Sequence, residues 1–169
     1  EGLKKVQDKI GDEVNHAVEM IYQCKGKLVI LGIGKTGIIG HKIAASLAST
    51  GTQTIFINAA EAIHGDLGMI GRDDVVMLIS HSGTSSEILN VISPIRNIGC
   101  AIIAMTGNPK SALAQKSDVV LNVAIEREAC PLGLAPTTST TAALVMGDAL
   151  MVCLMEKRHF QAENFALYH

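Results

Sequence analysis

The strongest constraint on the fold is a regular series of five short apolar runs rich in β-branched residues. The runs are separated by roughly 20 to 25 residues, and each is followed by a loop of Gly, Ser, Thr or Asn and then by a helix-compatible segment. Within each run the apolar residues are continuous, which is typical of strands covered on both faces. The runs occupy residues 28–31, 54–57, 75–79, 101–105 and 119–123.

Strands that alternate with helices form parallel crossovers. The sequence therefore predicts an α/β fold, a three-layer αβα sandwich with a five-stranded parallel sheet, in one domain spanning residues 1–169. Helices are predicted over residues 3–24, before Gly26, and over residues 137–158. The second helix is apolar nearly all round, so we expect it to pack on the sheet and also on another subunit.

Composition argues against several kinds of partner. The formal net charge is −2, and aromatic residues make up 3% with no Trp, which disfavours binding of nucleic acid or of an anionic membrane surface. The longest apolar stretch, residues 141–155, contains Asp148 and is shorter than a membrane span. Charged residues interrupt any signal-like run at the start, and the four cysteines form no C-x-x-C pair. We expect a cytoplasmic protein that binds neither nucleic acid nor a membrane.

Ligands of open parallel sheets bind at the carboxyl ends of the strands, so the loops there are candidate sites. The first predicted strand leads into Gly32, Gly34 and Gly37, which have the G-x-G-x-x-G spacing of dinucleotide sites. The second predicted strand, however, ends in Asn58 rather than in the acidic residue that holds a ribose. The alternative is a small phosphorylated ligand, approached closely by the glycine backbone.

Lys35 and Thr36 lie between the second and third glycines, and with a phosphorylated ligand both would point into the site. The alternative is that Lys35 is a solvated surface charge.

The third predicted strand leads into Ser80-His-Ser-Gly-Thr-Ser-Ser-Glu87, which has five hydroxyl side chains before a helix that opens near Ser85. Free N–H groups at a helix N-terminus, together with hydroxyl donors, can surround a phosphate. The structural alternative is a capping box formed by Thr84 and Glu87. A capping box accounts for one hydroxyl and one carboxylate, so we favour phosphate binding.

Four segments together resemble the sugar isomerase (SIS) domain family, and most closely its arabinose-5-phosphate isomerases. They are residues 34–37, 61–68, 80–87 and 128–141, with Ala-Leu-Tyr-His at 166–169. The resemblance implies interconversion of D-ribulose 5-phosphate and D-arabinose 5-phosphate for Kdo biosynthesis, without a cofactor, in a homotetramer with sites near subunit interfaces. We expect no metal, because no short-range ligand spacing supports a zinc site built from His64, His81 or His169. Thr84 departs from relatives that often carry Glu there. Many relatives also carry a CBS pair after the domain, and we expect none in this chain.

The resemblance also implies roles for particular residues. It implies phosphate binding by Thr36, Ser80, Ser82 and Ser85. It implies active-site roles for Lys35, Glu87, Glu128 and His169, with His64 as a further candidate.

Aldose–ketose isomerisation needs a base, a group that moves protons between the sugar oxygens, and a donor for the oxyanion. We favour Glu128 as the base, strengthened by partial burial beside apolar residues, His169 for the proton movement, and Lys35 for the oxyanion. The roles of Glu128 and His169 could be exchanged, and the alternative for Glu128 is an exposed loop charge without a role in the reaction.

Two other functions remain open. SIS domains also serve as sugar-phosphate sensors in transcription regulators, and such a module would keep the serine loop but could lose Lys35, Glu128 and His169. This chain retains all three. A hexulose-phosphate isomerase is the nearest enzymatic alternative, and pocket length near Glu128 and His169 would discriminate between them.

Overall fold

The computed structural model describes residues 2–8 and 10–168. The strands are β1 (Leu28–Gly32), β2 (Thr54–Asn58), β3 (Val75–Ile79), β4 (Ala101–Thr106) and β5 (Val119–Asn122). The helices of the described ranges are α1 (Gly2–Gln7), α2 (Asp12–Tyr22), α3 (Gly34–Ser49), α4 (Ala59–Ala62), α5 (Ser86–Ile98), α6 (Ala112–Gln115), α7 (Thr138–Lys157) and α8 (Ala162–Ala166), with a 3₁₀ turn η1 (Asp66–Met69). The five strands lie where the apolar runs predict them.

The strands form one parallel sheet in the order β2-β1-β3-β4-β5. Every residue of β1 and β3 is buried, which confirms that continuous apolar runs mark strands covered on both faces. The chain moves from β1 outward to β2 and then returns across β1 to β3. The loops after β1 and β3 therefore leave the sheet at its topological switch point, the usual ligand site of such folds.

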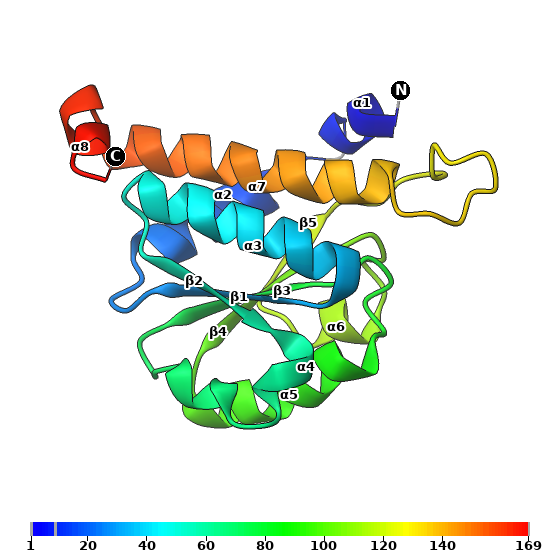
Figure 1. Ribbon diagram of the computed structural model, residues 1–169, viewed down its shortest axis with the longest axis horizontal. Coiled ribbons are helices and arrows are strands. Elements are labelled where there is room, and N and C mark those ends of the chain that lie inside the picture. The colour runs from blue at the N-terminus through cyan, green and yellow to red at the C-terminus, as the bar shows by residue number, and fades with distance from the viewer. Residues whose placement is uncertain (1, 9, 169) are drawn as a thin grey trace.

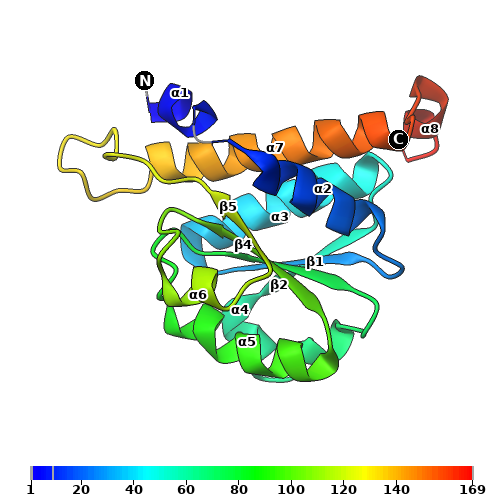
Figure 2. The same ribbon diagram turned by 180° about the vertical axis from the view of Figure 1, so that it is seen from behind.

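Helices cover both faces, giving the predicted three-layer sandwich (Figures 1 and 2). Helices α2 and α3 lie on one face, with α7 outside them, and α4, α5 and α6 lie on the other. Alternate residues of each strand divide between two cores, so that Ile30 and Met77 pack toward α3 while Leu31 and Leu78 pack toward α5. Burial on both faces fixes the sheet and, with it, the positions of the loops at its carboxyl edge.

Helix α7 confirms the predicted last helix, but its main contacts differ from those expected. It packs on α3 and α2 rather than mainly on the strands, because those two helices already cover this face. A Cβ on Gly147 would overlap the side chain of Ile43, so glycine lets α7 approach α3 closely. Asp148 pairs with Lys42 of α3 at 2.5 Å. Val145 and Val152 are about half exposed, and the subunit contact predicted for this helix stays a prediction.

Helix α7 is also, within the described ranges, the one helix long and apolar enough to cross a membrane by length and composition. Core helices of soluble proteins pass the same test. Seven residues of α7, including Met146, Leu150 and Leu154, are buried within this fold. The buried face and the Lys42–Asp148 ion pair agree with the sequence-based interpretation of a packed helix.

The prediction of a single helix over residues 3–24 is wrong. The segment forms two helices, α1 and α2, with Gly11 as the N-cap of the second. The backbone N–H of Gly11 donates to the carboxylate of Glu13 at 3.0 Å, and Asp12 and Glu13 complement the positive end of α2. The apolar spacing continues across the break because both helices pack on the same core, so periodicity alone does not reveal it.

Candidate active site

Three loops meet at the carboxyl edge of the sheet, after β1, β3 and β4. The register places Leu31 beside Leu78, and Ile79 beside Met105, so the residues that follow these strands begin about one strand spacing apart. The predicted glycine loop and serine loop are therefore neighbours. The loop after β4 was not singled out from the sequence, because it contains few chemically distinctive residues.

The glycines after β1 bring the strand and α3 close together. A Cβ on Gly32 would lie 3.1 Å from Cα and N of Gly37, and Gly34 adopts a φ of +58° in the left-handed region. Lys35 follows in the first turn of α3. It is exposed and makes no hydrogen bond or ion pair with a described residue. The amine is thus available to a ligand, which agrees with the predicted site role.

The neighbouring positions of this loop are already engaged. Thr36 Oγ1 donates to the carbonyl of Ile33 at 2.8 Å, so its hydroxyl is directed toward its own backbone. Asn58, which stands where a dinucleotide site has an acidic residue, accepts a hydrogen bond from the N–H of Ala60 and caps α4. The polar group at the end of β2 therefore serves the local fold, and the glycines serve close packing of strand and helix.

The serine loop has a defined internal geometry. Ser80 is 3% exposed, and its Oγ accepts a hydrogen bond from the N–H of Gly83 at 3.2 Å and lies 3.0 Å from Oγ of Ser85. Oγ of Ser82 accepts hydrogen bonds from the N–H and the hydroxyl of Thr84. The three serines predicted to bind phosphate are thus brought together on one turn at the start of α5.

The capping-box alternative for this turn is wrong. Helix α5 begins at Ser86, its N-cap is Ser85, and no side chain of the described residues caps it. Thr84 bonds to Ser82 instead, and the carboxylate of Glu87 accepts from Ser86 Oγ at 3.0 Å. The 13-residue α5 therefore presents its first N–H groups and the positive end of its dipole uncapped among hydroxyl groups. This arrangement favours a bound anion.

Glu128 is held firmly at the N-terminus of α7. Its carboxylate accepts hydrogen bonds from the N–H and Oγ1 of Thr137, at 2.9 and 3.0 Å, and from the N–H and hydroxyl of Ser139. Burial raises the pKa of Glu128, but these four hydrogen bonds outweigh burial and lower the pKa to about 2. The expectation that its surroundings strengthen Glu128 as a base is therefore wrong: the partners of the carboxylate stabilise its charged form.

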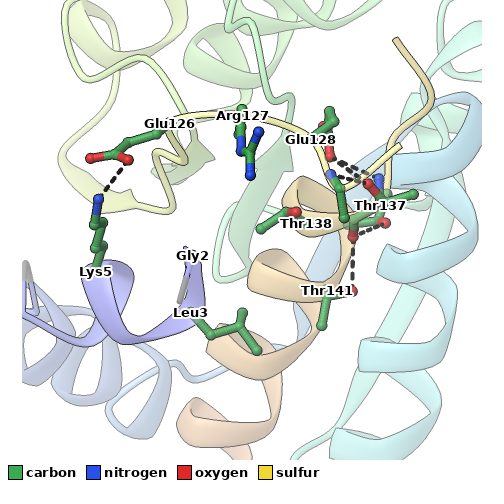
Figure 3. A pocket seen from close by; sticks show the side chains of 11 residues that line it. Gly2, Leu3, Lys5, Glu126, Arg127, Glu128, Thr137, Thr138 and Thr141 are labelled. Carbon is green, nitrogen blue, oxygen red and sulfur yellow. Dashed lines mark hydrogen bonds and ion pairs between the residues drawn. The ribbon is translucent and has the colours of Figure 1, made fainter. Parts of the chain in front are cut away.

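A pocket of about 700 Å³ lies between α1, the segment after β5 and the start of α7 (Figure 3). Of the predicted site residues that the structure describes, only Glu128 lines it. The pocket does not join Glu128 and the serine loop in one cavity of this chain. Arg127 and Lys5, which the sequence analysis passed over, also line it, and Lys5 pairs with Glu126 at 2.5 Å. No motif includes either cation, so sequence alone gives no signal for them.

Of the two histidines of the predicted site, the structure describes one, and no described contact joins it to the serine loop. His64 is exposed in the turn after α4. His169 lies outside the described residues. No group of three or more His, Cys, Asp or Glu in the described ranges is arranged to hold a metal ion. The structure thus brings together three of the residues predicted to bind phosphate, Ser80, Ser82 and Ser85, and no described contact joins them to Glu128 or His64.

Comparison with known proteins identifies the family of the chain. Residues 20–153 match the family model of the SIS domain. The chain is 51% identical to arabinose 5-phosphate isomerase KdsD of Pseudomonas aeruginosa over 161 residues, and 51% identical to KdsD of Escherichia coli K12 over 169 residues. These matches cover 95% and 100% of this chain but only 49% and 52% of the relatives, so the chain spans about half of their length.

A solved structure, that of c3406 from E. coli CFT073 in complex with arabinose 5-phosphate, superimposes with a TM-score of 0.97 at 42% identity. The superposition covers 99% of this chain and 89% of that one. The family match covers most of the chain, and the serine loop and the Glu128 segment lie inside it. On this evidence the chain belongs to the SIS domain family.

Proposed function

We propose that this chain is an aldose–ketose isomerase that interconverts D-ribulose 5-phosphate and D-arabinose 5-phosphate, without a cofactor, in the cytoplasmic supply of Kdo. The observation that carries the proposal is the uncapped, serine-lined N-terminus of α5, which fits the dianionic phosphate of a sugar phosphate. Relatives that are 51% identical to this chain over the matched residues are named arabinose 5-phosphate isomerases, and the structure of c3406 is a complex with arabinose 5-phosphate.

The reaction removes a proton from C1 of the ketose, passes through an enediol, and delivers a proton to C2 as the carbonyl moves to C1. The phosphate is held by Ser80, Ser82 and Ser85. Lys35, whose amine has no partner in the described chain, stabilises negative charge on the enediolate oxygens. A positioned acid or base contributes about 10²- to 10⁴-fold to the rate of such a step.

The hydrogen bonds of Glu128 bear on which group is the base. A carboxylate with a pKa of about 2 is a weak base, and it takes up a proton only if Thr137 and Ser139 release it. We therefore assign proton abstraction to His169, the alternative that the sequence leaves open. Glu128 then acts as a fixed negative charge that holds the segment after β5 against α7.

The separation between Glu128 and α8 supports an assembly of several copies. Glu128 lies at the N-terminal end of α7, and α8 lies at the opposite end (Figure 1). Helix α7 has 20 residues and is therefore about 30 Å long. A site that uses both Glu128 and the C-terminal residues would need the second set from a neighbouring copy. The proposed homotetramer, with sites near subunit interfaces, provides such a neighbour.

Light scattering on the purified chain tests the assembly. The expected result is a mass of about four chains of 17.8 kDa, because the apolar residues left exposed on α7 are then covered. The measurement is repeated across a tenfold range of protein concentration. A mass of one chain throughout would contradict the proposed assembly.

The reaction itself is tested by NMR with ribulose 5-phosphate in deuterium oxide. We expect arabinose 5-phosphate to appear with deuterium at C2, because the abstracted proton exchanges with solvent before it returns. Fructose 6-phosphate and a 3-hexulose 6-phosphate serve as six-carbon comparison substrates. Turnover of only a six-carbon substrate would identify a hexulose-phosphate isomerase. Phosphosugar binding without turnover by the intact assembly would identify a sensor module.

A further inference from the structure

The loop after β4, residues 106–111, packs directly against the serine loop, residues 80–85. Three backbone hydrogen bonds join these two segments or residues next to them, and a fourth joins Thr106 to the residue after β5. The N–H of Ser80 donates to the carbonyl of Met105, and the N–H of Gly107 donates to the carbonyl of His81 at 3.0 Å. The N–H of Leu113 donates to the carbonyl of Gly83, and that of Val123 to the carbonyl of Thr106. The loop after β4 is therefore bonded on both sides, to the serine loop and to β5.

The first close contact between the loops is at Gly83 of the serine loop. A Cβ at this position would overlap Oγ of Ser111 and lie 3.0 Å from Oγ1 of Thr106. Both of these side chains are buried. Ser111 also accepts a hydrogen bond from the N–H of Ala114 and caps α6, so it has little freedom to withdraw. Ser111 therefore occupies the space that a side chain at position 83 would need.

In the second close contact the loop after β4 supplies the glycine and the serine loop supplies the side chain. A Cβ on Gly107 would overlap Cε1 of the His81 ring and lie 2.5 Å from its Nδ1. The imidazole of the serine loop thus rests on the glycine of the other loop. Nδ1 of His81 is buried and has no hydrogen-bond partner in the described chain. A buried polar atom without a partner is unfavourable, so hydrogen bonding of this nitrogen does not explain where the ring lies.

These contacts form a reciprocal lock, in which each loop supplies one glycine and one side chain that fills the space over the other loop's glycine. We propose that this lock, made by Gly83 with Ser111 and by Gly107 with His81, positions the serine loop for phosphate. Gly107 and Ser111 are then positioning residues that act through the serine loop. The inference rests on the proposed function only in that the serine loop is taken to hold the phosphate.

The lock has a direct consequence for affinity. Phosphate oxygens are recognised by N–H and hydroxyl donors whose directions must converge, so a small displacement of the turn weakens several hydrogen bonds together. Substitution Gly107→Ala places a methyl group where the His81 ring lies. The φ of Gly107 is not in the left-handed region, so the substitution acts through this contact rather than through backbone strain. The ring, and the turn that carries it, must move.

The test is a double-mutant cycle of Gly107→Ala and His81→Ala, with the intact assembly. Inorganic phosphate is the probe for binding, by calorimetry, and KM for ribulose 5-phosphate is measured alongside. Gly107→Ala is expected to weaken phosphate binding about tenfold and to raise KM by a similar factor, with a smaller change in kcat. In the double variant the smaller residue at 81 makes room for the methyl group, so affinity returns to within about twofold of His81→Ala alone.

Gly71→Ala is the matched control, since its Cβ would meet only Asp74 Oδ2 at an ordinary 3.7 Å, at the opposite edge of the sheet. It is expected to bind phosphate like the wild type. Wild-type phosphate affinity in Gly107→Ala would overturn the inference, and so would a double variant that binds no better than Gly107→Ala. Absence of isomerase turnover in the wild type with phosphate binding intact would reject the proposed function alone, because the phosphate affinities still test the lock.

Discussion

Substitution of Lys35 by Met is expected to lower kcat/KM for ribulose 5-phosphate by about 10²- to 10³-fold, the range found when one donor to a developing oxyanion is removed. The fold should be unaffected, because Lys35 is exposed and has no partner among the described residues. Methionine keeps an unbranched side chain one atom shorter and removes the charge together with the N–H donors. Steady-state kinetics and thermal unfolding of the same preparation measure the two effects separately.

The division of the Lys35→Met effect between kcat and KM distinguishes two positions for the amine. A fall mainly in kcat identifies an interaction made only in the transition state, at the enediolate oxygens, and a rise mainly in KM identifies a contact with the phosphate. Lys35→Arg is the control, since it keeps the charge but replaces a compact ammonium by a planar guanidinium. If Lys35→Met retained wild-type kcat/KM, the residue would be only the solvated surface charge that the sequence leaves as an alternative.

The strands could be predicted from the sequence because burial on both faces leaves an unbroken apolar run. A polar side chain in β1 or β3 would be buried away from water on whichever face of the sheet it lay, which is unfavourable. These two strands are therefore apolar throughout and easy to recognise in the sequence. The position of the serine loop follows from the strand assignment, since the carboxyl ends of parallel strands share one edge. The position of the serine loop was therefore predictable from the sequence.

The predictions that failed depend on hydrogen bonds rather than on hydrophobic pattern. Thr84 and Glu87 have the spacing of a capping box, but α5 begins two residues after Thr84. The hydroxyl of Thr84 donates to Ser82 Oγ instead. The apolar neighbours of Glu128 suggested a raised pKa, yet Thr137 and Ser139, nine and eleven residues further along, reverse the shift. The conformation of residues 129–136 determines which donors reach this carboxylate, and the sequence pattern does not predict that conformation.

The contacts between the two loops are a second example of structure that the sequence pattern does not reveal. Gly83 and Gly107 look like ordinary turn glycines in the sequence, and only the folded chain reveals that Ser111 and His81 occupy the space beside them. Two such contacts between loops 20 or more residues apart require the sheet to be in place first. The sequence thus identifies which groups carry the chemistry more readily than which residues position them.

Glu128→Gln is expected to destabilise the fold by about 2 kcal/mol at neutral pH, after allowance for partial exposure of the carboxylate. The pKa of Glu128 falls from 4.5 to about 2 on folding, so the ionised group stabilises the folded chain at any pH above its unfolded value. That contribution is lost as the pH falls from about 4.5 toward 2. Denaturant unfolding of both proteins between pH 3 and pH 7 should therefore give a difference that shrinks in acid.

Glu126→Gln is the control for this comparison, because Glu126 pairs with Lys5 at the surface with its side chain 66% exposed. A pair of that kind contributes about 0 to 1 kcal/mol, so the control should unfold nearly like the wild type at each pH.

Kinetics of Glu128→Gln then separate an anchoring role from a role as base. A side chain that only anchors α7 leaves kcat within about tenfold of the wild type, since the amide preserves the shape and part of the hydrogen bonding. Loss of a general base costs about 10²- to 10⁴-fold. A loss in that range, with no pH-dependent change in stability, would return the role of base to Glu128 and require Thr137 and Ser139 to release its carboxylate when substrate binds.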